Sequence, residues 1–240
     1  MPHALFTLKS HSDIEKFELE DSVVRGAARA LLRTESTITR LLIDIRTERD
    51  APLQVDTRSP GWDAALVISA DDHHDAFPES MDELVVDAAS VQGRWEVSIK
   101  EIRDIGKEWV GASTPGAKIS FVLTRSAGVD AASFDQWLDD VANEIAAQMV
   151  DGGARCITLV DRELLDAPCD TIVSFWFPTD SALESATEER LFASVLSSHL
   201  VDEDSILVQQ SVEHRNYPNP NAWEMPDGPL MPVPEPEPES

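Results

Sequence analysis

Three side chains of this sequence have the chemistry of a general acid or base. His214 ends an apolar segment directly after Glu213, and a histidine near a carboxylate can be a base that titrates close to neutral pH. Adjacent residues of a strand point to opposite faces, so these two side chains cannot pair with each other directly. The plainer interpretation of His214 is a histidine at the exposed end of a strand.

His199 and Asp44 are the other candidates for the base. His199 lies late in a predicted helix, where a favourable interaction with the helix dipole is the structural alternative. Asp44 lies in the apolar segment 41–45. A buried acid is costly unless it is paired, and burial raises its pKa, which suits proton transfer. A pairing with Arg40 or Arg46 on the same face of the strand is the structural alternative.

An enzyme of this kind also needs groups that hold the substrate. Arg125 follows a predicted strand and could bind a carboxylate or an enolate, or it could pair with one of the many surface acids. Tryptophan side chains most often pack in a core, but they also form the walls of aromatic pockets. The candidate residues for substrate contact are Trp137, Trp176, Phe121 and Ser174.

Metal and cofactor chemistry has little support in the sequence. The densest group of possible metal ligands is the segment 71–75, Asp-Asp-His-His-Asp. Five consecutive loop residues rarely converge on one ion, so a solvated loop or helix start is favoured. Cys156 and Cys169 have no histidine at metal-binding spacing and are predicted to be buried thiols. A glycine-rich phosphate loop, a CxxC pair, a GxSxG elbow and an HExxH motif are all absent. We expect no metal and no cofactor.

The elements that must position these residues follow a pattern that occurs twice. Asp63 and Asp170 each begin a short apolar run, and the last strand of each half ends in a glutamate, Glu101 or Glu213. Asp21-Ser22 and Ser133 are predicted to cap the first and third helices. The apolar patterns predict strands at 3–9, 38–47, 64–70, 95–102, 119–125, 155–162, 171–177 and 206–214, and helices at 21–33, 80–90, 133–149 and 184–200.

Each half therefore has the order β-α-β-β-α-β, which is the ferredoxin-like order. The strands are apolar on both faces, so both faces must be covered. Helices cover one face, and the sheet of the other half is the natural cover for the second. The predicted fold is α+β, with two ferredoxin-like repeats whose antiparallel sheets pack into an α/β barrel. The predicted parts are a first repeat at 1–105, a linker at 106–117, a second repeat at 118–215 and a tail rich in proline and glutamate at 216–240.

The composition narrows the possible partners. The chain has 240 residues, with 45 acidic and 19 basic side chains and a formal net charge of −26. Such a surface repels phosphate backbones and anionic lipids, so we expect no nucleic acid and no membrane as partners. The first residues do not resemble a signal peptide, and no apolar run approaches the length of about 18 residues needed to span a membrane. A cytoplasmic location is the expectation.

The second half of the chain also resembles a known family. The segment Lys118–Val129 looks like the opening strand of EthD-type domains in the dimeric α/β-barrel superfamily. Phe134 and Trp137 match the aromatic positions that follow in that family, and Val141 stands where the family has a histidine. The segment 170–177 resembles a later family strand through Trp176 and Phe177, and the resemblance extends to the closing strand at 206–214.

The resemblance implies small-molecule pockets between a sheet and its helices. The superfamily includes oxygenases without a cofactor, polyketide cyclases, lactone isomerases, dehydratases and lyases. Our leading hypothesis is a cofactor-independent enzyme that acts on a small, largely apolar molecule of aromatic or polyketide-like kind. Its reaction would be an acid–base elimination, cyclisation or isomerisation, with a cofactor-free monooxygenase as a variant. The alternative is a binding or accessory protein without chemistry. Either a monomeric pseudo-dimer or a homodimer is compatible with the repeat.

Overall fold

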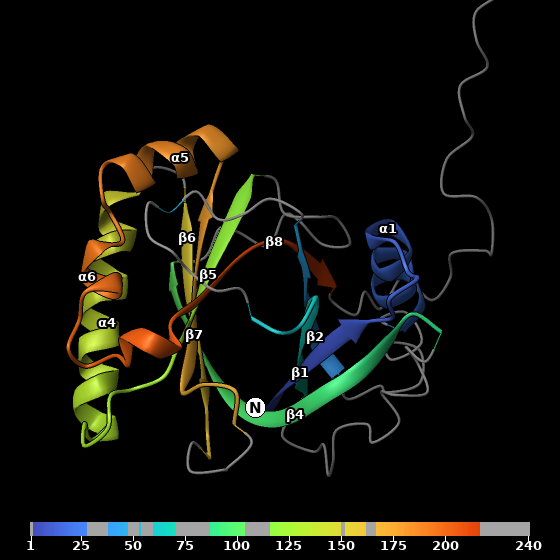
Figure 1. Ribbon diagram of the computed structural model, residues 1–240, viewed down its shortest axis with the longest axis horizontal. Coiled ribbons are helices and arrows are strands. Elements are labelled where there is room, and N and C mark those ends of the chain that lie inside the picture. Colours follow the sequence, from blue (N-terminus) through green and yellow to red (C-terminus); the bar gives the residue numbers. More distant parts are fainter. Residues whose placement is uncertain are drawn as a thin grey trace, which may run out of the picture.

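A computed structural model describes residues 2–27, 38–47, 53, 60–70, 87–103, 116–149, 152–161 and 167–216. Within these residues, eight strands form a closed antiparallel barrel (Figure 1). The strands are β1 His3–Ser10, β2 Ile38–Arg46, β3 Ala64–Ala70, β4 Ala89–Arg103, β5 Ala117–Leu123, β6 Gly153–Leu159, β7 Thr171–Phe177 and β8 Leu207–Asn216. The helical elements are α1 Lys16–Glu20, the π-helical turn η1 Asp21–Ala27, α4 Ala131–Gln148, α5 Asp180–Glu188, α6 Ala193–Leu196 and the 3₁₀ turn η2 Glu203–Ser205.

The order of strands around the barrel confirms the predicted fold class. The first half of the chain contributes β4-β1-β3-β2, and the second half contributes β8-β5-β7-β6. Each set has the strand order of a ferredoxin-like sheet, 4-1-3-2. The two sheets join edge to edge through hydrogen-bonded seams between β2 and β8 and between β4 and β6. The barrel therefore closes within one chain, and its closure leaves no free sheet edge among these eight strands.

The barrel has helices on two opposite sides (Figure 1). The helices α4, α5 and α6 cover the outer face of the second sheet, and α1 with η1 lies over the first sheet. Alternate residues of the strands point outward into these two helix-covered cores or inward into the barrel. The inward apolar residues form a third cluster, which includes Leu5, Leu42, Ala65, Val67, Trp95, Val97, Val122, Ile157, Leu159 and Ile172.

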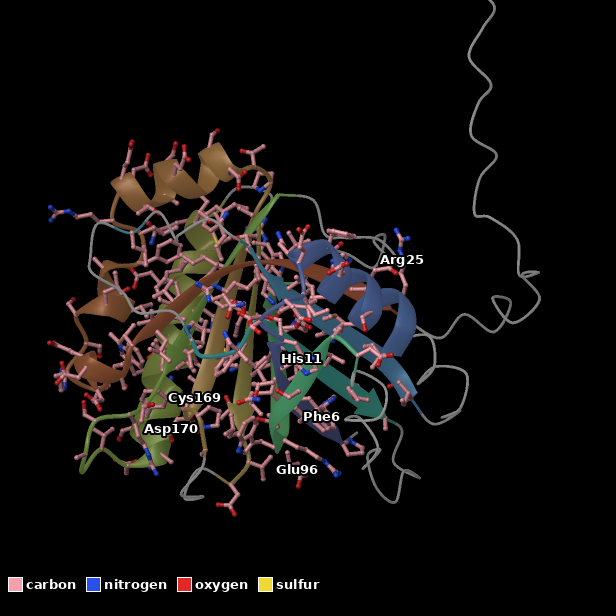
Figure 2. All side chains as sticks on the ribbon, turned by 45° about the vertical axis from the view of Figure 1, so that its right-hand side comes forward. Phe6, His11, Arg25, Glu96, Cys169 and Asp170 are labelled. Carbon is pink, nitrogen blue, oxygen red and sulfur yellow. The ribbon has the colours of Figure 1, made fainter. Side chains whose placement is uncertain are left out.

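Asp63 and Asp170, which begin the repeated sequence pattern, make the same contact in the two halves. The Asp63 carboxylate accepts a hydrogen bond from the backbone N–H of Ser10, at the end of β1, at 3.1 Å. The Asp170 carboxylate accepts one from the backbone N–H of Arg125, just after β5, at 2.9 Å. Asp170 lies beside Cys169 immediately before β7 (Figure 2). Each aspartate thus ties the start of the third strand of its half to the end of the first strand. A single duplicated unit stays a prediction.

Two helices begin earlier than their sequence signals indicated. The first begins at Lys16, not at residue 21, because the Glu18 side chain accepts the backbone N–H of Glu15 at 3.0 Å and so satisfies a free donor at the helix start. The third begins at residue 131, because its N-cap is Asp130, whose carboxylate accepts the backbone N–H of Ser133 at 2.9 Å. Ser133 is therefore the residue that receives the cap rather than the cap itself.

The predicted helix at 184–200 is wrong in its length. It is divided into α5 and α6, because Arg190 between them adopts a left-handed backbone with a φ of 60°. The strand β4 begins at Ala89, so residues 89–90 are strand and not the end of a helix. The rest of the helix predicted there, the linker at 106–115 and the tail from 217 lie outside the described residues. The division of the chain into four parts stays a prediction.

Gly116, which directly precedes β5, offers a test of this packing. Its φ is +88°, and a Cβ atom placed there would lie 1.9 Å from the carbonyl oxygen of Phe177. Gly128 has a similar φ of +84°, but nothing lies within 4 Å of its added Cβ. We expect Gly116→Ala to lower the free energy of unfolding by about 3 kcal/mol and Gly128→Ala by only about 1 kcal/mol. Urea unfolding measures both, and equal losses would contradict the steric account.

Candidate functional site

Six charged side chains meet inside the barrel, and we call them the interior charge network. They are Arg40, Asp44, Glu101, Lys118, Arg155 and Glu213. The three from the first half of the chain and the three from the second half carry a balanced formal charge. They lie on five strands, at inward-facing positions beside the apolar interior cluster. The network therefore connects both halves through the middle of the barrel.

The contacts of the network alternate between acids and bases. The ammonium of Lys118 lies 2.6 Å from both carboxylate oxygens of Asp44 and 2.9 Å from Oε2 of Glu213. Arg155 donates to the same Oε2 of Glu213 and to Oε1 of Glu101, each at 2.7 Å. The same Glu101 oxygen accepts from Arg40, at 2.6 Å. Each buried charge thus has at least one partner of opposite sign.

The centre of the network is sealed from solvent. The side chains of Lys118, Arg155 and Glu213 are at most 1% exposed, while Asp44 and Glu101 reach 17% and 28%. The indole of Trp176 lies between the two buried cations, with its ring centroid 4.7 Å from Lys118 Nζ and 4.7 Å from Arg155 Cζ. This cation–π contact stabilises cations that are buried away from water.

Burial raises the pKa of Asp44, and the nearby Glu213 carboxylate raises it further, although Lys118 opposes the shift. The rise expected from the sequence is therefore found, but the partner is Lys118 and not Arg40 or Arg46. Burial alone would lower the pKa of Arg155, but Glu213 and Glu101 outweigh that effect and raise it above its usual value. Arg155 therefore remains a permanent positive charge inside the barrel.

His214 lies on the opposite face of its strand from the network. It points outward from β8 toward α1, and its Nε2 atom lies 3.3 Å from Oε1 of Glu20. The side chain of His214 is 9% exposed and that of Glu20 is 41% exposed. Burial lowers the pKa of His214, and the carboxylates of Glu20, Asp44 and Glu213 partly oppose this. The imidazole is therefore mostly neutral at pH 7 and has a carboxylate beside it that the sequence did not indicate.

A groove lies on the same outer side of β8 as His214, although His214 is not part of its walls. Two adjoining cavities, of about 320 Å³ and about 390 Å³, share Lys16 and Thr47 in their walls, and we call them together the α1 groove. The volumes are in the range of small-molecule sites. Val212 lines the groove and lies two residues before His214 on the same face of β8, a distance of about 7 Å along the strand. The other residues of the groove are Ser10, Ile14, Leu19, Arg46, Asp63, Gly116, Ala117, Asp180, Gln210 and Ser211.

Two of the predicted catalytic residues lie away from this groove. His199 is exposed in a turn after α6. The side chain of Arg125 lies with its Nε atom 3.3 Å from Asp170, so its position matches the alternative of an arginine paired with an acid. Arg125 and Lys118 are seven residues apart along one strand direction, which corresponds to about 23 Å. The proposed catalytic roles of His199 and Arg125 stay predictions.

The predicted substrate-contacting residues are divided between two environments. Phe121 lies in the outer core, where its ring centroid is 5.1 Å from that of Phe192. Trp137 of α4 packs on the same side, 5.6 Å from Phe134. Trp176 and Ser174 are inside the barrel, and Ser174 forms a 2.8 Å hydrogen bond with Ser120. These four residues therefore do not line a single site.

Metal ligands and reactive thiols give no further site within the part of the chain that the structure describes. No group of three or more His, Cys, Asp or Glu side chains there could hold a metal ion. The segment 71–75 lies outside that part. Burial raises the pKa of Cys156 and of Cys169 to about 12 in each case, so both remain protonated thiols. None of the described helices is long and apolar enough to cross a membrane.

Sequence reasoning missed Lys118, Arg155 and Glu20. The signal for the first two was present, because each is a basic residue within an otherwise apolar strand, as Asp44 is an acidic one. Glu20 gave no such signal, because its contact with His214 depends on how α1 lies on the sheet.

Comparisons with known proteins find similarity at the level of structure. No protein-family model matches the sequence, and no curated protein matches it either. A candidate monooxygenase from Fusobacterium nucleatum has a TM-score of 0.53 and 9% identity, over 89% of this chain and 91% of its own. A candidate monooxygenase from Lactobacillus acidophilus has a TM-score of 0.49 and 9% identity, over 91% and 96% of the two chains. A variant of chlorite dismutase from Candidatus Nitrospira defluvii has a TM-score of 0.47 and 10% identity, over 88% and 90%.

The likeness to the Fusobacterium nucleatum protein supports the closed barrel fold of this chain. Sequence identities near 10% support a shared fold but do not support a shared activity. The closer resemblance to EthD-type domains stays a prediction.

The neighbours of His214 should set the pH at which it titrates. We expect its NMR titration midpoint to lie below 6.5, because burial disfavours the charged ring. Glu20→Gln should lower the midpoint further, because it removes a negative charge that favours the imidazolium. Lys16→Met should raise it, because the ammonium of Lys16 disfavours the imidazolium. Shifts of the opposite sign would show that these groups do not face the ring.

The interior charge network should be sensitive to the loss of one member. Glu213→Gln leaves Lys118 and Arg155 with an uncompensated buried charge, so we expect the free energy of unfolding to fall by roughly 3–5 kcal/mol. The matched control is Asp21→Asn, which breaks an exposed ion pair with Arg25 at the outer side of η1 (Figure 2) and should change stability by less than about 0.5 kcal/mol. Urea unfolding at pH 7 measures both, and similar losses would contradict the role of burial.

Proposed function

We propose that this protein is an acid–base enzyme that acts on a small molecule bound in the α1 groove, with His214 as the general base. The observation that carries this proposal is the position of a buried imidazole 3.3 Å from a carboxylate, on the face of β8 where Val212, two residues before it, lines a groove of small-molecule size. Glu20 is the residue that orients the ring. This arrangement fits the leading hypothesis from the sequence, and it gives His214 a carboxylate neighbour, Glu20, in place of Glu213, which cannot pair with it directly.

The geometry favours His214 over Asp44 as the base. Both carboxylate oxygens of Asp44 lie 2.6 Å from Nζ of Lys118, so protonation of Asp44 would disrupt this ion pair. The imidazole of His214 is held less tightly, because its Nε2 atom lies 3.3 Å from Glu20 and makes no hydrogen bond to any described residue. In the proposed site, Nε2 carries the proton that faces Glu20, and Nδ1 is the atom that accepts the substrate proton.

The proposed step is the removal of a proton from a carbon next to a carbonyl group. The C–H bond breaks, its proton moves to Nδ1 of His214, and its electron pair forms an enolate. The ammonium of Lys16, which lines the groove one helical turn before Glu20, stabilises the charge on the enolate oxygen. Return of the proton to another atom of the substrate completes an isomerisation, and loss of a leaving group completes an elimination.

Two alternatives remain as proposals of lower support. The neighbour from Fusobacterium nucleatum is described as a monooxygenase candidate, and a cofactor-free oxygenation begins with the same deprotonation. A shared fold does not transfer an activity, so this variant rests on analogy alone. A binding protein without chemistry would use the same groove but would leave the C–H bonds of its ligand intact.

Proton exchange tests the proposed step without knowledge of the natural substrate. Phenylacetone would be incubated with the protein in D₂O, and the loss of its benzylic C–H signal followed by proton NMR. We expect the wild-type protein to accelerate the exchange, and His214→Gln to reduce that acceleration by roughly 100-fold or more. Glu20→Gln should reduce it by a smaller factor, because it disturbs only the orientation of the ring.

The controls separate this base from the other histidines. His11→Gln changes an exposed histidine near the start of α1 and should keep the full acceleration. His199→Gln tests the rival candidate from the sequence. A fully active His214→Gln protein that unfolds at the wild-type urea concentration would overturn the proposal. Binding of phenylacetone without exchange would favour the binding protein.

A further inference from the structure

Two basic side chains of the α1 groove have N–H donors that no residue in the described part of the chain accepts. Lys16 is half-buried and makes no hydrogen bond or ion pair to any residue that the structure describes. The guanidinium of Arg46 makes no hydrogen bond within the same residues, and its nearest carboxylate oxygen, on Asp63, is 3.8 Å away. At that distance the pair is an ion pair without a hydrogen bond.

The nearby acids leave the N–H donors of these two cations without a hydrogen bond. The carboxylate of Asp63 is already engaged, because it accepts from the Ser10 hydroxyl at 2.7 Å and lies 3.0 Å from the ammonium of Lys9. Partial burial is the largest single influence and raises the pKa of Asp63, but the hydrogen bonds from Ser10 and Lys9 together outweigh it and lower the pKa, so Asp63 stays ionised within its own cluster. The other acid of the groove, Asp180, accepts a hydrogen bond from Gln210 at 3.2 Å. The free donors of the groove are therefore on Lys16 and Arg46.

We infer that the substrate of this site is a small oxo acid, whose carboxylate binds to Arg46 while its carbonyl oxygen faces Lys16. A planar guanidinium with unused N–H groups matches the two oxygens of a carboxylate, whereas an ammonium is a point charge suited to a single developing oxyanion. Arg46 and Lys16 line the same cavity of about 320 Å³, which is large enough for a molecule that spans both.

A monocarboxylate fits this groove better than a phosphate does. The groove contains two acids as well as its two cations, and the whole chain has a net charge of −26. A dianion would meet more repulsion in such a field than a single negative charge. This inference rests on the proposed acid–base function, since it names the substrate class of the same site.

A matched pair of probes tests the inference. The probes are 4-oxo-5-phenylpentanoate and its methyl ester, which share the ketone and the phenyl group and differ in the negative charge and one methyl group. Their dissociation constants would be measured by NMR titration of the ¹⁵N-labelled protein. We expect the acid to bind at least about tenfold more tightly than the ester, since charge-assisted hydrogen bonds have this magnitude.

Two variants test whether the preference for the acid over the ester arises in the α1 groove. Arg46→Gln should remove the preference for the acid and leave the affinity for the ester unchanged. The control is Arg25→Gln, which removes one positive charge from a side chain that is 73% exposed outside the groove, and it should keep the preference. Equal affinity for acid and ester, or a preference that survives in Arg46→Gln, would overturn the inference. Tighter binding of inorganic phosphate than of the acid would also overturn it.

The outcome is independent of the test of the proposed function. Phenylacetone carries no carboxylate, so its His214-dependent exchange does not require Arg46. If the exchange persists and the acid shows no preference, the acid–base function stands and only the substrate class is wrong. If the acid binds through Arg46 but no variant of His214 changes the exchange, the groove binds carboxylates without the proposed chemistry.

Discussion

The fold depends on the requirement that every charge inside the barrel has a partner. Arg155 is fully buried, and it is held by Glu101 from the last strand of the first half and by Glu213 from the last strand of the second half. Lys118 adds a second link, from β5 to Asp44 of β2. Removal of one partner from such a network costs far more than the network contributes in net stability. The two sheets are therefore coupled, because neither half can keep its buried charges neutral without the other.

The same network fixes the register of the strands. Lys118 and Arg155 are inward-facing residues of strands whose outward residues lie in the core beneath α4, α5 and α6. A slip by one residue would turn each charge into that apolar core and would turn the apolar residues inward. The apolar pattern alone does not prevent such a slip, because these strands are apolar on both faces. The charged residues at a few inward positions therefore determine which face of each strand points into the barrel.

The sequence predicts the strands well because their apolar runs are short and end at polar residues. Both 64–70 and 171–177 are confirmed without a change of bounds, and the aspartate before each has a structural role in its half. The strand β4 and the helix starts were less predictable. The caps Glu15 and Asp130 lie outside the apolar patterns that indicated the helices, and a left-handed residue that is not glycine, Arg190, gives no clear signal.

The candidate site was predictable only in part, for a related reason. His214 and Asp44 stand out in the sequence because each is a titratable residue in an apolar strand. Their partners do not, because Lys118 is 74 residues from Asp44, and Glu20 is on a helix whose orientation the sequence does not give. The family resemblance was found in the second half of the chain and so directed the search for a site to that half. The α1 groove, in contrast, is built by both halves at the seam of β2 and β8.

The short helix α1 is the reason that the proposed function places the acid–base chemistry on the outer face of this seam and not in the barrel interior. Inside the barrel each charge is fixed by a neighbour of opposite sign, so a proton can move only at the cost of an ion pair. On the outer face, α1 places Glu20 beside His214 and Lys16 in the adjoining groove, one helical turn away. Glu20 raises the pKa of the imidazole and Lys16 lowers it, while burial keeps it below its usual value. In the proposed function, a base that is neutral at pH 7 would accept the proton, and the nearby cation, which has no partner among the described residues, would stabilise the charge that remains.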